Sequence, residues 1–174
     1  MIELAASFDA QLSDLAPYLI YLIVGAIVFF ETGVLFAFFL PGDSILFSAG
    51  LVAAAHGDVN IVILVSVIFI AAFLGDQVGF VIGRLVGRPY LDKHDSPRMQ
   101  KMIARSERFY EQTGWWAVVA ARFFPWIRTF VPPIAGASKM NYYKFLSANI
   151  LGALLWGVGI TLAGYYAASL PWVK

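Results

Sequence analysis

Long apolar stretches, separated by short polar segments, dominate the pattern of the chain. Between residues 15 and 55 the only charged residues are Glu31 and Asp43. As one straight helix this stretch would reach roughly 60 Å at 1.5 Å per residue, about twice the hydrocarbon thickness of a bilayer. The chain therefore has to turn within it. Pro41 and Gly42 are the expected break, because they remove a backbone donor and supply turn geometry.

Three further apolar segments follow this break. Segment 44–55 is too short for a full crossing, which favours a re-entrant helix. Segments 59–86 and 145–171 are each long enough to span a bilayer as a helix. Along the first of these spans and at the residue after it, glycines recur every fourth residue and predict a small-residue face for close helix packing: Gly75, Gly79, Gly83 and Gly87.

The most polar part of the chain, residues 84–114, contains seven lysines and arginines and four acidic residues. By the positive-inside rule this basic loop is expected in the cytoplasm. Within it, Ser96 is a typical N-cap, Pro97 suits the first helical position, and Gly114 suits the position after a helix end. We therefore expect an amphipathic helix that lies in solvent or among lipid headgroups.

The segment 115–138 is apolar again but carries two arginines, Arg122 and Arg128. It is interrupted by three prolines, which predict helix breaks: Pro125, Pro132 and Pro133. Its sequence "FFPWIRTFVPPIAG" is locally similar to "FFLPGDSILFSAG" around Pro41. Broken helices in two halves of opposite orientation are the plan of many secondary transporters.

These patterns predict an all-α polytopic membrane protein built as an inverted repeat, in which a Pro-broken re-entrant helical hairpin precedes a transmembrane helix in each half. One domain is expected over residues 1–174. It would comprise an N-terminal interfacial segment (1–16), a first re-entrant unit (17–55), a transmembrane helix (59–86), a basic cytoplasmic loop and helix (87–114), a second re-entrant unit (115–138) and a transmembrane helix (145–171).

Composition agrees with a membrane protein and narrows the chemistry. Hydrophobic residues make up 60% of the chain and charged residues 13%, against about 45–50% and 25% in soluble domains. The net charge of +1 does not favour nucleic acid as a partner. The chain has no cysteine, which excludes disulfides, thiolate metal sites and cysteine nucleophiles. We expect neither a cofactor nor a metal, while a homo-oligomer stays open.

The charges inside the apolar segments are the candidate functional residues. A charge facing lipid costs about 2.5–3.5 kcal/mol, so Glu31, Asp43, Arg122 and Arg128 are expected around an internal polar cavity. The arginine fork suits a phosphate or carboxylate, which predicts an anion clamp. A membrane-embedded carboxylate can carry a proton, because desolvation favours its neutral form.

Two questions stay open at this point. Glu31 and Asp43 could be proton-linked gates for the anion, or they could simply neutralise the two arginines as buried ion pairs without a ligand. Asp76 could accept a hydrogen bond from an arginine across the bundle or line the cavity as a secondary member.

Three motifs together resemble the bacterial DedA family, which is related to the eukaryotic SNARE-associated Golgi, or VTT-domain, proteins. They read "FFETGVLFAFFLPGDSILFSAG", "GDQVGFVIGR" and "ARFFPWIRTFVPPIAG", and the resemblance extends from about Phe29 to Gly164. It implies that Glu31 and Asp43 are the essential acidic residues and Arg122 and Arg128 the essential basic ones. It also implies two membrane-dipping segments, a place in the bacterial cytoplasmic (inner) membrane, and lipid translocation linked to the proton gradient.

The function expected first is translocation of undecaprenyl phosphate, or another polyprenyl phosphate, with protons as a possible coupling ion. A phospholipid flippase or scramblase is the near alternative, since both lipids carry a phosphate. A proton-coupled small-ion antiporter and a membrane scaffold are further alternatives. An enzyme is not expected, because His56 and His94 lie in predicted loops without the context of a lipid-phosphatase nucleophile.

Overall fold

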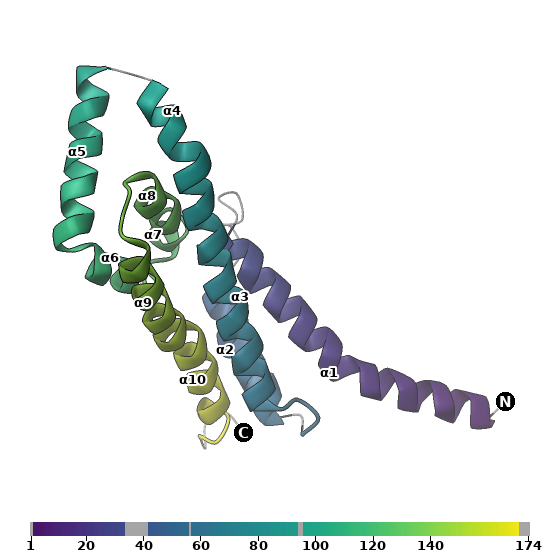
Figure 1. Ribbon diagram of the computed structural model, residues 1–174. Helices are drawn as coiled ribbons and strands as arrows, with labels where there is room; N and C mark the ends of the chain where they lie inside the picture. Colours follow the sequence, from purple (N-terminus) through teal and green to yellow (C-terminus); the bar gives the residue numbers. More distant parts are fainter. Residues whose placement is uncertain (1, 34–41, 56, 94–95, 171–174) are drawn as a thin grey trace.

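The computed structural model describes residues 2–33, 42–55, 57–93 and 96–170, and every regular element in these ranges is helical. Two long helical stretches lie side by side at the centre, and the other helices contact them (Figure 1). The expected all-α architecture is confirmed. Pro41, His56 and His94 lie outside the described residues.

The first helix, α1, runs from Ile2 to Gly33 and contains Pro17. The sequence predicted a boundary between residues 16 and 17, whereas the helix continues through it. A proline removes only one backbone donor, and residues that favour helix lie before it (Leu15 and Ala16) and after it (Leu19). The N-terminal part of α1 extends away from the other helices (Figure 1).

The second helix, α2 (Gly42–Ala55), begins two residues earlier than expected and packs mainly against α10 (Gly159–Ala167). Asp43 occupies its first turn, where a negative charge is favourable. At 14 residues the helix is about 21 Å long, less than the hydrocarbon thickness of about 30 Å.

The longest continuous helical stretch, Ile61–Lys93, has 33 residues and is apolar enough to cross a membrane. It consists of α3 (Ile61–Ile82), a π-helical turn η1 (Gly83–Gly87) and α4 (Arg88–Lys93). The predicted loop from residue 87 is therefore helical as far as Lys93. Arg88 explains part of this extension, because it forms an i,i+4 ion pair of 2.9 Å with Asp92.

The basic amphipathic helix is α5 (Pro97–Gln112), which lies beside α4 at one end of the molecule (Figure 1). Glu107 on α5 forms an ion pair with Arg88, and the same guanidinium donates to the carbonyl of Ala137 at 3.4 Å. Arg88 thus ties α4 to two other segments. Gly114 was expected just after the end of this helix, but it begins the next one, α6 (Gly114–Ala121).

Three short helices make up the segment that the sequence predicted to be broken. After α6 come α7 (Pro125–Arg128) and α8 (Val131–Ala137). Pro125 and the pair Pro132 and Pro133 occupy the first turns of α7 and α8. A proline is favourable there because the missing N–H would have no partner, so the prolines start helices as well as interrupt them.

The second candidate membrane span, Tyr142–Ala167, has 26 residues. It consists of α9 (Tyr142–Ala153), a second π-helical turn η2 (Leu154–Val158) and α10. Asn141 caps its start by accepting from the backbone N–H groups of Tyr143 and Lys144.

The glycine stripe on α3 and η1 makes the close contacts that its spacing predicted. Gly75 packs against Gly33 and Thr32 of α1, and Gly79 packs against Pro132 and Pro133 of α8. The carbonyl oxygen of Pro133 occupies the space that a Cβ on Gly83 would need. These glycines therefore let α1 and α8 approach the central helix on different sides.

A buried cluster of ion pairs as the candidate functional site

Arg128, the last residue of α7, brings together the two acidic residues of the first half. Its Nη2 forms an ion pair with Glu31 near the end of α1, and its Nη1 donates to Asp43 Oδ1 of α2 at 2.7 Å. Arg128 is 5% exposed and Glu31 1%. The first two helices thus meet a helix far along the chain at one guanidinium group.

Trp156 of η2 completes this group from the second long helix. Its indole N–H donates to Asp43 Oδ1 at 2.7 Å, and its ring centroid lies 4.4 Å from the guanidinium carbon of Arg128. The guanidinium carbon of Arg122 lies 6.0 Å from the same ring. The buried indole therefore connects the two arginines by cation–π contacts.

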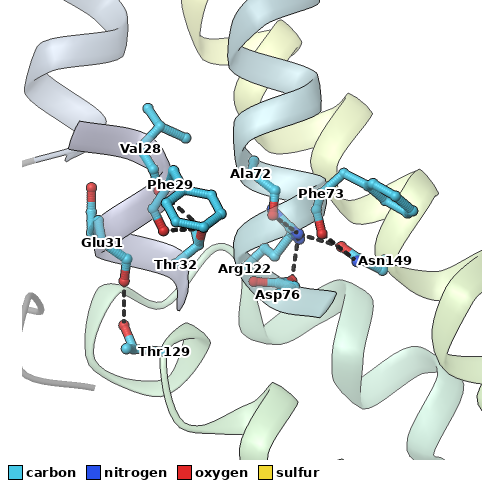
Figure 2. Close-up of polar contacts among 10 residues, drawn as sticks. All are labelled: Val28, Phe29, Glu31, Thr32, Ala72, Phe73, Asp76, Arg122, Thr129 and Asn149. Carbon is cyan, nitrogen blue, oxygen red and sulfur yellow. Dashed lines mark hydrogen bonds and ion pairs between the residues drawn. The ribbon is translucent and has the colours of Figure 1, made fainter. Parts of the chain in front are cut away.

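Arg122, at the C-terminal end of α6, has a different acidic partner. Its Nη2 forms an ion pair with Asp76 of α3 and donates to the side-chain oxygen of Asn149 on α9 (Figure 2). The carbonyl of Ala72 accepts a longer hydrogen bond of 3.4 Å from the same nitrogen. Asn149 is itself held by donating to the Phe73 carbonyl at 3.1 Å, so it positions Arg122 against α3.

Several polar atoms of this cluster are buried without a hydrogen-bond partner among the described residues. They are Arg122 Nε and Nη1, Arg128 Nε and Glu31 Oε2. Buried polar groups in native proteins nearly always have a partner, which can be a protein group, water or an ion. Each arginine therefore retains unused donors although each already pairs with a carboxylate.

The backbone around Glu31 is as closely packed as its side chain. Gly42 approaches the Glu31 carboxylate so closely that a Cβ there would overlap it. Thr129, 1% exposed, donates to the Glu31 carbonyl at 3.4 Å, as Figure 2 shows. The start of α2 and the residue after α7 therefore both hold the end of α1.

Helix geometry places the cluster inside the apolar span. Asp76 lies about 22 Å along α3 from its start at Ile61. Asn149 and Trp156 lie about 10 and 21 Å along the second long helix from Tyr142. Because the two spans are antiparallel neighbours, the cluster extends from near the middle of the span toward the basic end of the molecule (Figure 1).

The sequence located the charged members of this cluster but not how they pair. Glu31, Asp43, Arg122 and Arg128 come close together, and Asp76 is the acceptor for an arginine, one of the two roles left open. Direct ion pairs between arginines and carboxylates occupy the centre of the cluster. Asn149 and Trp156 were missed. A signal for Asn149 existed, because a buried amide in a charge-free span requires a partner.

Comparison with known proteins agrees with the motifs. The VTT domain family model matches residues 40–166. Protein DedA of Escherichia coli K12 is 38% identical over 179 aligned residues that cover all of this chain and 82% of the relative. An uncharacterized membrane protein of Mycobacterium leprae is 44% identical over 85% of this chain.

The chain spans 66% of the length of that mycobacterial relative, and 65% of a similar one from Mycobacterium tuberculosis that is 46% identical. No solved structure matches the chain. The family match covers most of the chain, and the mycobacterial relatives are named membrane proteins. The protein is therefore a membrane protein that belongs to the DedA, or VTT-domain, family.

Proposed function

We propose that this protein is a transporter that moves undecaprenyl phosphate, or a closely similar polyprenyl phosphate, across the bacterial cytoplasmic membrane. The observation that carries the proposal is the pair of buried arginines, Arg122 and Arg128, which keep N–H groups without a partner among the described residues. Arginine binds phosphate with several donors at once. The isoprenoid chain would stay in the bilayer while the headgroup enters the cluster.

The balance of charge in the cluster supports coupling to protons. Three carboxylates (Glu31, Asp43 and Asp76) face two guanidinium groups, so the fully ionised cluster carries one excess negative charge. An anionic headgroup would compete with the carboxylates for the same arginines. Protonation of Glu31 or Asp43 would release Arg128 for the headgroup, which makes these two residues gates, with Asp76 as the partner of Arg122.

The packing supports re-entrant segments in an inverted repeat. α2 in the first half and α8 in the second are both too short to cross a bilayer. The short helix of each half packs on the long helix of the other half. Gly50 of α2 contacts the carbonyl of Thr161, and Gly136 of α8 contacts the carbonyl of Phe80. This reciprocal arrangement is the one expected for two halves of opposite orientation.

The orientation proposed for the protein places the basic loop 84–114 in the cytoplasm. The cluster contains arginines, carboxylates and an amide, and a transport role needs no covalent step by any of them. We therefore assign binding and release of a lipid headgroup to the cluster, without catalytic chemistry.

The test is transbilayer movement in liposomes that contain the purified full-length protein and polyprenyl phosphate. The fraction of phosphate headgroups accessible from outside is followed with and without a pH gradient. Wild type is compared with Arg128→Gln, and with Arg105→Gln as a control that removes an exposed charge of α5. Rapid movement in wild type and the control, with loss in Arg128→Gln, is the expected result.

Other outcomes would identify the alternatives. Movement of phospholipid, but not of polyprenyl phosphate, would make the protein a phospholipid flippase or scramblase. If neither lipid moves faster than in empty liposomes, the lipid-transport proposal is wrong. Pumping of protons against a small ion would then indicate an antiporter, and its absence would indicate a scaffold.

A further inference from the structure

A second group of positive charges surrounds a cavity outside the buried cluster. The cavity has a volume of about 660 Å³ and lies where η1, α5 and the segment between α8 and α9 meet. Its lining includes the cationic residues Arg84, Arg88, Lys139 and Lys144, together with Tyr110 and Ser138. Glu107 and Glu111 also line it, so positive charges outnumber negative ones.

Most of this positive charge is not neutralised by ion pairs. Arg88 is occupied by Glu107 and Asp92. Among the described residues, no ion pair involves Arg84, Lys139 or Lys144. Arg84 lies over the Phe80 ring at 5.3 Å, and the Lys144 ammonium group donates to the backbone carbonyl of Glu111 at 3.4 Å. These three cations remain available for an anion.

The backbone at Lys139 is a second indication that the cavity binds an anion. With a φ of 56°, it is the one non-glycine residue with positive φ in the described part of the chain. Its N–H donates to the Gly136 carbonyl at 3.2 Å, which ends α8. Glycine or asparagine normally occupies such a position. Lysine is unfavourable in this backbone conformation. Its presence here therefore points to a role of the side chain at the cavity.

The cavity lies at the level of a membrane surface. α3 has 22 residues and is about 33 Å long, so η1 begins just beyond the hydrocarbon thickness of about 30 Å. The second span starts at Tyr142 on the same side. Tyr142 and Tyr143 are 41% and 77% exposed, and tyrosines are enriched at membrane–water interfaces.

From these observations we propose that the cavity binds the phosphate-monoester headgroup of a membrane lipid at the cytoplasmic surface. The cations Arg84, Lys139 and Lys144 provide the charge. Burial raises the pKa of Tyr110 to about 12, so its phenol stays neutral and can only act as a hydrogen-bonding group there.

The position relative to the buried cluster suggests a loading site. α8 begins three residues after Arg128 and ends at the cavity, and its seven residues span about 10 Å. This step rests on the proposed function, because the lipid held at the surface would be the one that the cluster moves. The headgroup-binding step does not depend on transport and can be measured without it.

The experiment is calorimetric titration of the full-length protein in phosphatidylcholine nanodiscs. Dihexanoyl phosphatidic acid is the lipid probe, and glycerol 3-phosphate presents the same headgroup without chains. The test variant combines Arg84→Gln, Lys139→Asn and Lys144→Gln; asparagine tolerates positive φ, so the turn at 139 is retained. The matched control combines Lys101→Gln, Arg105→Gln and Arg108→Gln on α5, which removes the same charge outside the cavity.

The expected result is a loss of affinity for the lipid probe by about tenfold or more in the test variant, with the α5 control close to wild type. Equal weakening in both triple variants, or none in the test variant, would overturn the assignment. Glycerol 3-phosphate binding as tightly as the lipid would show that the ligand is a soluble phosphate. The two proposals fail separately, because the triple cavity variant tests binding by titration and Arg128→Gln tests transport in the liposome assay.

Discussion

Asp43 accepts hydrogen bonds from both Arg128 and Trp156 at one oxygen, each at 2.7 Å. The carboxylate belongs to α2, the guanidinium to α7 and the indole to η2. A single oxygen atom therefore joins the short helix of the first half to two elements of the second half. The indole also lies over the Arg128 guanidinium, so that Arg128 is buried while the Asp43 side chain stays 43% exposed.

Replacing Trp156 with phenylalanine tests this connection. An aromatic ring remains for Arg128, but the hydrogen bond to Asp43 is lost, which should lower the free energy of unfolding by about 1–3 kcal/mol. Thermal unfolding of the purified protein in detergent, followed by circular dichroism, measures the change. Trp116→Phe is the control, because Trp116 is 66% exposed and should have little effect. Equal shifts for the two variants would contradict the role of Trp156.

The ion pair between Arg122 and Asp76 separates a structural role from a functional one. Arg122→Met alone should destabilise the protein by about 3–5 kcal/mol, because it leaves a buried carboxylate without its partner. The double variant Arg122→Met, Asp76→Leu should recover most of that stability, since apolar residues can replace a buried pair. Under the proposed function it should still fail to transport lipid. A stable and fully active double variant would show that the pair is only structural.

The close approach of α2 and α10 predicts the effect of a single methyl group. Gly50→Ala places a Cβ against the carbonyl of Thr161, and the overlap should destabilise the protein by about 1–3 kcal/mol. Gly159→Ala, at the start of α10, is the control. A Cβ there has no atom within 4 Å, so alanine should be neutral or slightly stabilising. Thermal unfolding of the two variants under identical conditions measures the difference in stability, and equal stability of the two would contradict the close contact at Gly50.

Arg88 is predicted to hold α5 in place. Arg88→Gln removes the ion pairs to Glu107 and Asp92 and weakens the contact with Ala137. Backbone amides of α5 should then exchange hydrogen about tenfold faster, as expected for a loss of about 1.4 kcal/mol in local stability. Exchange in α3 should not change. Arg84→Gln is the control, because Arg84 forms no ion pair with a described residue. Unchanged hydrogen exchange of α5 in Arg88→Gln would exclude this role of Arg88.

The sequence predicted much of this architecture because the bilayer imposes simple length rules. Apolar stretches and prolines were enough to place helix starts near Gly42 and Pro125 and to locate the two long spans. Helix ends were less predictable. The extension of the first span to Lys93 depends partly on tertiary contacts of Arg88, and the π-helical turns η1 and η2 have no sequence signal as clear as a proline.

For the candidate site, residue type identified the charges but not their partners. Glu31, Asp43 and Arg128 stand out because charge is rare in apolar segments. These residues meet because α1, α2 and α7 pack together. The spacing of residues along a single helix does not predict such packing between helices. Trp156 is one of many aromatic residues in the chain, and only the fold reveals that it lies between two arginines.

The crossed packing of short and long helices has a consequence for the chain as a whole. α2 relies on α10, and α8 relies on α3 and η1, so each half lacks a surface that the other half supplies. Under the proposed inverted repeat, a half-length chain could complete these contacts with a second copy of opposite orientation beside it. The two halves would then correspond to an antiparallel dimer whose subunits are fused into one polypeptide.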